Sequence, residues 1–426
     1  MKRFDYPRLQ ETVYRETLPN GLTIAVVPRP GFSRKEAFFV TDFGSIHTRF
    51  RLDGQEYLTP DGIAHYLEHK MFDLPGRDVS AEFAAMGAST NAFTSYDVTA
   101  YYFSCTDHFE DCLRLLLEFV STPYFTPESV EKEQGIIGQE IGMNEDSPDS
   151  VVFEELCRAM YAEHNIRIPI LGTVETIAQI TPEFLHTCHR AFYAPGNMML
   201  CVAGDVEPDQ VAAIAAELLP KEAAAPAEKL TPMEQSLSCP VPFVSRQMDV
   251  AMQNFQLGFK CAPVPKGEEG IRQEVVGDLA AELLFGEASE LYLRMYEDGL
   301  IDSSFGGGFE TVDGMAMLTC GGDSEHAEEV RDAILAQAKV LCDRGINEQD
   351  FLRMKKSILG RKVRELDNFT STCVRLCTYH FAEFDYMDFP RVLEAVTCAE
   401  VEAFLRQAVQ AEHCALAVIC PREQEA

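Results

Sequence analysis

The chain has 426 residues, of which 46% are hydrophobic, and its formal net charge is −32 at pH 7. This length allows two or three domains with a large core, and the acidic balance disfavours a protein that binds nucleic acid. No apolar run approaches the roughly 18 residues that a membrane-spanning helix needs, so we expect no membrane partner.

The surplus of acidic side chains has two possible interpretations. It keeps a protein soluble, or it forms an acidic chamber that attracts cationic peptides, whose turnover would then fall steeply with salt. There are 14 cysteines and none is spaced Cys-x-x-Cys. Some, such as Cys201 and Cys320, lie in apolar runs, which is typical of buried thiols. Because no apolar signal segment follows Met1, we expect free thiols in the cytoplasm.

The first elements in chain order are strands. The pair Asn20-Gly21 predicts a turn before a strand over residues 22–27, and a second strand is expected over 36–43. Further on, residues 87–95 are rich in small side chains and lead into a strong strand over 99–104. These two segments together predict a hairpin.

Between these strands, residues 60–72 predict a helix that carries two histidines. Thr59-Pro60-Asp61 has the order of an N-cap, a first-turn proline and an acid. His65, Glu68 and His69 occupy positions i, i+3 and i+4, which share one helix face. Two imidazoles held in this way can bind zinc, with the glutamate beside the metal. The alternative is an ordinary polar group on an amphipathic helix, and a third ligand would decide between the two.

A later helix offers that ligand. It begins at Thr126-Pro127-Glu128, after an amphipathic helix over 107–121, and carries Glu133 and Glu140 on one face. The apolar residues that would bury it are Val130, Ile136, Ile137 and Ile141. A carboxylate facing the histidine pair completes a His, His, Glu set and leaves one zinc position to water, as in catalytic zinc sites.

The helix capped by Thr181-Pro182-Glu183 carries a second pair, His186 and His189. We interpret both as ordinary histidines, because no carboxylate or cysteine is spaced to join them. The other elements expected in the first half are a helix over 150–163, a strand over 198–203 and a helix over 208–219.

Residues 221–235 predict a linker. It separates a zinc-bearing domain over 1–220 from a domain over 236–426 whose patterning repeats the first half. The helix that corresponds to the histidine-bearing helix, near 272–286, has no histidine pair. We therefore expect a duplicated α+β domain whose second copy binds no zinc.

The His-x-x-Glu-His motif followed by Glu-x6-Glu resembles the pitrilysin/insulinase family of zinc peptidases, the inverzincins. His69 and Glu140 are 71 positions apart (140 − 69). The resemblance runs from Leu18-Pro19-Asn20-Gly21-Leu22 to the last strand near 415–420. The amino-acid sequence of residues 135–140 is most similar to that of bacterial half-length members of the YmfH type.

This resemblance implies a zinc-dependent endopeptidase with one zinc ion per chain. Its ligands would be His65, His69 and Glu140, with Glu68 as the base that activates water and Glu133 as a supporting glutamate. The implied fold is α+β, with two duplicated domains, each a mixed, mostly antiparallel sheet flanked by helices, as in the mitochondrial processing peptidase and pitrilysin.

The resemblance also assigns a role to the hairpin. In the family, the segment equivalent to 87–95 is the sheet edge beside the zinc, where a peptide substrate pairs as an added strand. The candidate substrate-binding residues are Asn91, Ala92, Phe93 and Phe72.

One departure from the family concerns partners. Its second domain often carries an Arg and a Tyr seven positions apart, whereas here Ile301 lies seven after Arg294 and Asp302 lies seven after Met295. We therefore expect the zinc-bearing subunit of a two-chain peptidase, either a homodimer or a heterodimer with a related half-length subunit that carries the Arg/Tyr pair. The alternative is a non-catalytic zinc-binding assembly or peptide-binding subunit of a processing complex.

Overall fold

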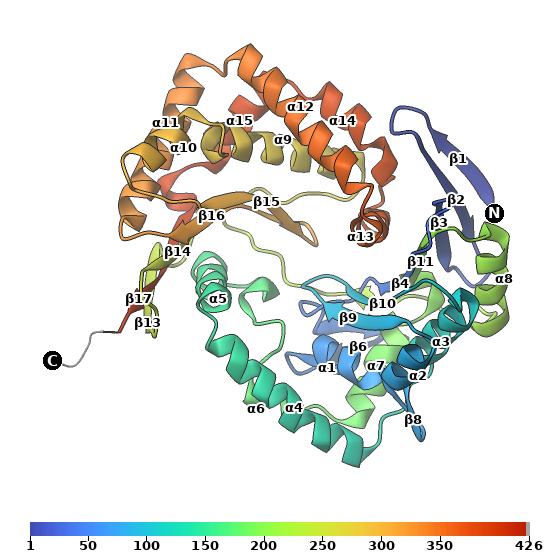
Figure 1. The fold of residues 1–426 in the computed structure, drawn as a ribbon. Coiled ribbons are helices and arrows are strands. Elements are labelled where there is room, and N and C mark those ends of the chain that lie inside the picture. The colour runs from blue at the N-terminus through green and yellow to red at the C-terminus, as the bar shows by residue number, and fades with distance from the viewer. Residues whose placement is uncertain (423–426) are drawn as a thin grey trace. The chain divides into compact units, whose positions relative to one another are not determined.

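The computed structural model describes residues 1–422, which divide into two compact units (Figure 1). Unit 1 consists of Met1–Ile141, Pro169–Thr231 and Val363–Met387. Unit 2 consists of Gly142–Ile168, Pro232–Lys362 and, within the described residues, 388–422. None of the described helices is long and apolar enough to cross a membrane.

A seven-stranded sheet forms the centre of unit 1, in the order β1-β2-β3-β11-β4-β10-β9. Neighbouring strands are antiparallel, except that β3 and β11 are parallel. The strands are β1 (Lys2–Tyr6), β2 (Glu11–Thr17), β3 (Thr23–Pro28), β4 (Lys35–Thr41), β9 (Ser89–Thr94), β10 (Thr99–Cys105) and β11 (Met198–Gly204). The strand β9 therefore forms one edge of the sheet.

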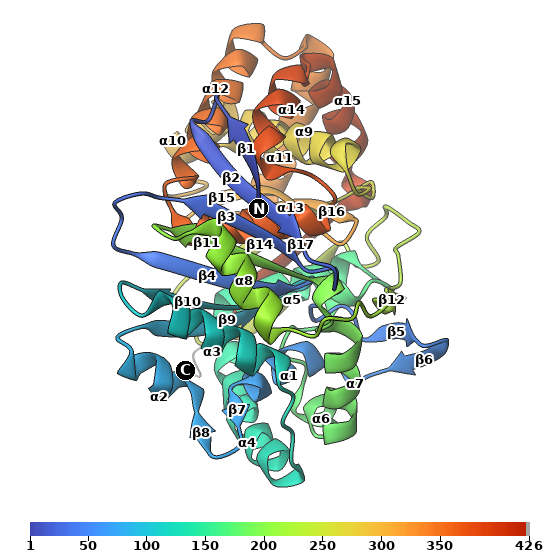
Figure 2. The same ribbon diagram turned by 90° about the vertical axis from the view of Figure 1, so that its right-hand side faces the viewer.

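Helices cover both faces of this sheet. Side chains such as Phe39, Tyr101 and Leu200 share one core with helices α1, α3, α7 and α8, and Figure 2 shows α3 and α8 in front of the strands. Helix α13 packs on β4 and β11, so β11 is buried along its whole length. The helices are α1 (Ile63–Met71), α2 (Val79–Ala85), α3 (Phe109–Ser121), α4 (Pro127–Glu145), α6 (Val174–Ile177), α7 (Pro182–Phe192), α8 (Pro208–Leu218) and α13 (Phe369–Phe381).

Unit 1 also contains smaller sheets. One has the order β12-β5-β6 and the other pairs β7 with β8. Their strands are β5 (Arg49–Leu52), β6 (Gln55–Leu58), β7 (Asp73–Leu74), β8 (Arg77–Asp78) and β12 (Glu228–Lys229).

Unit 2 is built on a five-stranded sheet in the order β13-β17-β14-β16-β15. Its strands are β13 (Phe243–Met248), β14 (Asn254–Cys261), β15 (Gly306–Val312), β16 (Met315–Asp323) and β17 (Cys414–Pro421). Helix α5 approaches β14 so closely that a Cβ on Gly258 would lie 2.4 Å from the sulfur of Met160. The helices are α5 (Pro148–Met160), α9 (Glu268–Phe285), α10 (Glu290–Glu297), α11 (Ala327–Arg344), α12 (Glu348–Glu365), α14 (Phe389–Ala395) and α15 (Cys398–Ala408).

The two units are copies of one design. The order β13-β17-β14-β16-β15 repeats β3-β11-β4-β10-β9, including the single parallel pair. Helices α4 and α12 begin 221 positions apart (348 − 127), as do α5 and α13 (369 − 148). The structure thus confirms the predicted duplicated α+β fold.

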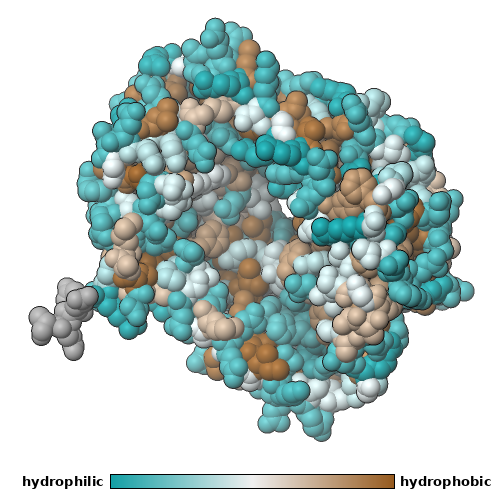
Figure 3. All heavy atoms as spheres, viewed as in Figure 1, coloured by the Kyte–Doolittle hydropathy of each residue, from teal (hydrophilic) through white to brown (hydrophobic). Residues whose placement is uncertain are grey.

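Hydrophilic side chains cover most of the face that Figure 3 shows, and apolar side chains lie among them in small groups. Exposed large apolar residues come from separate elements; examples are Phe32 before β4, Leu58 at the end of β6 and Leu293 on α10. Single exposed apolar side chains of this kind are normal on a folded protein.

The contact units do not follow the predicted domain limits of 1–220 and 236–426. Helix α5, expected in the first domain, packs on β14 and β17 of unit 2, and α13, expected in the second, packs on β4 and β11 of unit 1. The predicted linker 221–235 is also shorter, because Glu228–Lys229 pairs with β5. Sequence order alone does not reveal on which sheet a helix buries its apolar face.

The predicted start of the histidine-bearing helix is wrong. Helix α1 begins at Ile63, and its N-cap is Gly62, with a left-handed φ of 87° and no side-chain cap. Instead of capping, the Thr59 hydroxyl donates to the carbonyl of Thr48. A Cβ on Gly62 would lie 2.4 Å from the carbonyl oxygen of Leu171, so only glycine fits here.

We predict that Gly62→Ala lowers the free energy of unfolding by about 2–3 kcal/mol, because it adds a clash to an unfavourable φ. Urea unfolding of the purified protein measures this loss. Gly54→Ala is the control, since Gly54 has a φ of 77° and no heavy atom within 4 Å of the place that a Cβ would take; it should lose only about 1 kcal/mol. Equal losses would contradict the close approach to Leu171.

Candidate metal centre

Helix α1 holds three ionisable side chains on one face. His65 and Glu68 are 7% and 8% exposed, and His69 is partly exposed. The ring centroids of His65 and His69 are 4.6 Å apart. The apolar residues of α1, including Leu67 and Met71, belong to the core of unit 1. The helix is therefore fixed by its buried face, and its histidines cannot separate without disturbing the core.

Helix α4 brings Glu140 to both histidines. Its Oε2 atom lies 3.6 Å from Nε2 of His65 and 3.5 Å from Nε2 of His69. The three donor atoms lie within 4.8 Å of one another, and no other such group of three His, Cys, Asp or Glu side chains is found in residues 1–422. Donors of a tetrahedral zinc ion are about 3.4 Å apart. The donor set and its spacing therefore fit zinc.

A buried hydrogen bond joins α1 to α4. The hydroxyl of Tyr66 donates to the carbonyl of Val130, one turn before Glu133. Tyr66 is fully buried, and burial together with the charge of Glu133 raises its pKa far above the usual value, so it remains a donor. Ile137 and Ile141 of α4 join the same core. These contacts set the position of α4 and hence of its carboxylates.

Glu133 contacts the ring nitrogen of His69 that does not face Glu140. Its Oε1 atom is 3.0 Å from Nδ1 of His69. If Nδ1 carries the proton and donates it to Glu133, the lone pair of Nε2 points toward Glu140. Lys70, which is buried, places its Nζ atom 3.9 Å from the other oxygen of Glu133. Burial alone would raise the pKa of Glu133, but the hydrogen bond with His69 and the charge of Lys70 outweigh it and lower that pKa.

Glu68 has a different environment from the other carboxylates. Its Oε2 atom accepts a hydrogen bond of 2.7 Å from the hydroxyl of Thr94 on β9. Burial raises the pKa of Glu68, although the charges of His65 and His69 and the hydrogen bond from Thr94 oppose this effect. A carboxylate with a raised pKa beside a cluster of donors is suited to proton transfer.

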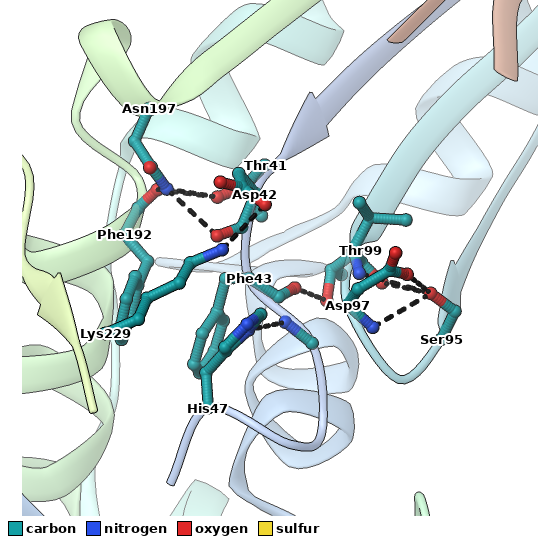
Figure 4. A network of polar contacts seen from close by, with 12 residues as sticks. Thr41, Asp42, Phe43, His47, Ser95, Asp97, Thr99, Phe192, Asn197 and Lys229 are labelled. Atoms are coloured by element: carbon teal, nitrogen blue, oxygen red, sulfur yellow. Dashed lines mark hydrogen bonds and ion pairs between the residues drawn. The ribbon is translucent and has the colours of Figure 1, made fainter. Parts of the chain in front are cut away.

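A polar network supports the turn that follows β9 (Figure 4). The backbone N–H of Gly44 donates to His47, and the hydroxyl of Thr99 donates to the carbonyl of Phe43. In the turn itself, the Ser95 hydroxyl donates to Asp97 over 2.8 Å. A Cβ on Gly44 would lie 2.5 Å from the backbone of Tyr96 and Asp97. The β4 loop and the β9–β10 turn are thus packed together.

The predicted substrate residues lie in two places. Asn91, Ala92 and Phe93 are on the edge strand β9, where Asn91 is exposed and its Oδ1 accepts the N–H of Ala92. Strand alternation puts Ala92 on the face of Thr94, toward α1, and Phe93 on the other face, near Tyr102. Phe72 instead ends α1, and its ring packs 5.0 Å from that of Phe119. This contact turns Phe72 toward the core between α1 and α3.

The second histidine pair has ordinary contacts. Nε2 of His189 lies 3.1 Å from the carbonyl oxygen of Val120, and its ring stacks on Tyr193. Burial lowers the pKa of His189 to about 4. His186 is exposed and lies beside the ring of Phe125. The two histidines therefore point to different partners, as the sequence interpretation expected.

Sequence reasoning did not single out Tyr66, Lys70 or Thr94. Each could have been found from its position in the sequence. Tyr66 and Lys70 are polar residues next to the histidines of a helix whose other residues outside the motif are apolar. Thr94 follows Ala92 by two positions, so both lie on the face of β9 that is turned to α1.

Two family models match the chain, one described as insulinase (peptidase family M16) over residues 54–174 and one described as peptidase M16 inactive domain over residues 179–358. The protein "Uncharacterized zinc protease YmfH" of Bacillus subtilis (strain 168) is 35% identical over 435 residues, which cover 99% of this chain and 100% of that protein. The chain belongs to the M16 peptidase family.

Solved structures agree with this assignment. An M16-like peptidase from Alicyclobacillus acidocaldarius is 35% identical, with a TM-score of 0.92 over 96% of this chain and 98% of that one. Pitrilysin shares the fold at 15% identity and a TM-score of 0.78, and the match covers 100% of this chain but only 47% of pitrilysin. This M16 protein is thus a half-length member of the family.

We predict that Tyr66→Phe lowers the free energy of unfolding by about 1 kcal/mol, because it removes the hydrogen bond to Val130 while leaving the ring in place. Tyr124→Phe, at a tyrosine that is 36% exposed, should change it by less than about 0.5 kcal/mol. Urea midpoints of both variants measure the difference. A Tyr66→Phe variant as stable as the parent would contradict the role of this bond in docking α4.

Proposed function

We propose that this M16 protein is a zinc-dependent endopeptidase. The observation that carries the proposal is the convergence of donor atoms from His65, His69 and Glu140 beside the buried carboxylate of Glu68. The relative YmfH is named a zinc protease, which supports the same metal and reaction class. One zinc ion per chain would be held by the three donor side chains.

In this proposal, zinc when bound supplies a Lewis acid that polarises a peptide carbonyl and lowers the pKa of a water molecule. Glu68 is the general base: it takes a proton from the attacking water and delivers it to the leaving amine. The Thr94 hydroxyl occupies Oε2 of Glu68, which leaves Oε1 for the proton. Glu133 keeps His69 in the tautomer whose Nε2 faces Glu140.

The edge strand β9 is the proposed docking element for peptides. A peptide that adds to β9 as a further strand gains main-chain hydrogen bonds and little sequence specificity. Asn91, Ala92 and Phe93 would contact it, whereas the core packing of Phe72 favours an indirect role for that residue. The net charge of −32 favours cationic peptides.

We also propose that the active form has two chains. The second copy lacks the Arg/Tyr pair: Arg294 lies on α10, and Ile301, seven positions later, is buried. The candidate partners are a second copy of this chain and a related half-length chain. Only the related chain, if it carries the pair, would supply these groups. The 14 cysteines are all free thiols, which favours a reducing compartment, and we propose the cytoplasm.

The alternative is a subunit that binds zinc or peptide without cleaving it. The absent Arg/Tyr pair and the match of residues 179–358 to a model described as an inactive domain favour it. Zinc content and peptidase activity of the isolated chain, measured together, distinguish the two functions. A fully zinc-loaded chain that cleaves no peptide, alone or with an added half-length partner, would support the alternative.

We predict that Glu68→Gln keeps about one zinc ion per chain but lowers kcat at least about 100-fold, because the amide cannot accept the proton. Zinc is measured by elemental analysis and turnover by cleavage of a Lys/Arg-rich peptide with an internally quenched fluorophore. Turnover within a few-fold of the parent would mean that Glu68 is not the base.

We predict that His65→Ala and Glu140→Ala each reduce zinc to well below one ion per chain after dialysis, since two donors hold the ion poorly. The matched control is His186→Ala, which removes an exposed histidine outside the cluster and should leave zinc content and turnover unchanged. Full zinc retention by Glu140→Ala would contradict the proposed ligand set.

A further inference from the structure

We propose that Thr94 is a positioning residue for the general base, so that the strand offered to substrate also orients the catalytic carboxylate. This inference rests on the proposed function, in which Glu68 is the base and β9 receives the peptide. It adds a residue of the edge strand to the groups on which turnover depends.

Thr94 contacts Glu68 directly, and the Glu68 side chain is buried. Thr94 Oγ1 donates to Glu68 Oε2 over 2.7 Å, and Glu68 is 8% exposed. A hydrogen bond to a charged acceptor is strengthened where little water competes. The terminal carboxylate torsion of a glutamate is otherwise broad. A donor fixed at Oε2 selects one orientation of the carboxylate plane and leaves Oε1 to exchange protons with water.

Thr94 is itself held in place by its neighbours. It is the last residue of β9 and pairs directly with Thr99 of β10. The hydroxyl of Thr99 donates to the carbonyl of Phe43 and lies 3.5 Å from that of Thr94. In the turn, the Ser95 hydroxyl accepts the N–H of Val98 over 3.1 Å. The network of Figure 4 thus supports the residue that holds the base.

Within residues 1–422, the same strand has a free edge, because β9 is the last strand of its sheet. Thr94 and Ala92 face α1, two positions apart on that strand. A peptide that pairs with the free edge would steady the backbone of β9 and with it the Thr94 hydroxyl. Thr94 should therefore influence the rate of the bound complex more than the affinity for peptide, which main-chain hydrogen bonds supply.

The first test is kinetic. Thr94→Val, which replaces the hydroxyl with a methyl group of similar size, should lower kcat about 10- to 100-fold while KM stays within about threefold and zinc content is unchanged. Thr94→Ser, which restores a hydroxyl, should return kcat to within about threefold of the parent. The control Thr187→Val removes a hydroxyl that donates to the carbonyl of Glu183 on α7, and should have no effect. A parental kcat for Thr94→Val, or a Thr94→Ser variant as slow as Thr94→Val, would overturn the proposal.

The second test does not require activity. In chelator-treated protein, the shift in urea midpoint caused by Thr94→Val is measured in the parent and in a Glu68→Ala background. A clearly larger shift in the parent supports a direct interaction between the two side chains, and equal shifts overturn it. A zinc-loaded parent that cleaves no peptide, alone or with an added half-length partner, would instead refute the proposed function and, with it, the catalytic meaning of the contact, so the two failures are distinguishable.

Discussion

The candidate metal centre depends on the packing of α4 against α1. The two helices are distant in sequence, and they are joined by the buried hydrogen bond from Tyr66 to Val130 and by apolar residues such as Ile137. Because Glu133 and Glu140 are two turns apart on α4, one docking geometry serves both. Glu133 meets His69 from behind at 3.0 Å, and Glu140 meets the Nε2 atoms of both histidines at 3.5–3.6 Å.

Basic and acidic side chains alternate around the site. Lys70 neighbours Glu133, Glu133 neighbours His69, and His69 neighbours Glu140. Burying several ionisable groups is costly, and such a group is retained mainly where function needs it. The order also explains a division of labour: two carboxylates with lowered pKa values face cationic or imidazole groups, whereas burial raises the pKa of Glu68, which receives a hydroxyl donor.

Unit 2 shows what the duplicated design does without a histidine pair. The equivalent helices are α9 and α12, and Arg361 lies 221 positions after Glu140 (361 − 140). Arg361 forms an ion pair of 2.6 Å with Glu282 of α9, and Lys362 lies 3.4 Å from Asp278 of the same helix. In this copy the acids lie on the first helix and the cations on the second. Ion pairs between α9 and α12 thus join these two helices in unit 2.

Much of this could be predicted from the sequence, because the decisive signals are local. Helix periodicity placed His65, Glu68 and His69 on one face, and the cap at Thr126 was correct, with its hydroxyl accepting the N–H of Ser129. Predictions from the sequence were wrong where contacts with a segment distant in the sequence determine the local structure. Gly62 caps α1 because Leu171 approaches it. Helices α5 and α13 belong to the opposite units from those expected, because an amphipathic pattern does not show which sheet the helix will cover. Thr94 was not predicted because its hydrogen-bond partner, Glu68, lies on another element.

X-ray absorption at the zinc edge tests the central claim most directly, because it reports the atoms bound to the metal in the purified protein. Two imidazole nitrogens and one or two oxygens at about 2.0–2.1 Å are expected, with no sulfur in the first coordination sphere. In a chain with 14 cysteines, zinc–sulfur distances of about 2.3 Å would show that zinc binds elsewhere. That result, or a protein that takes up no zinc, would contradict the account.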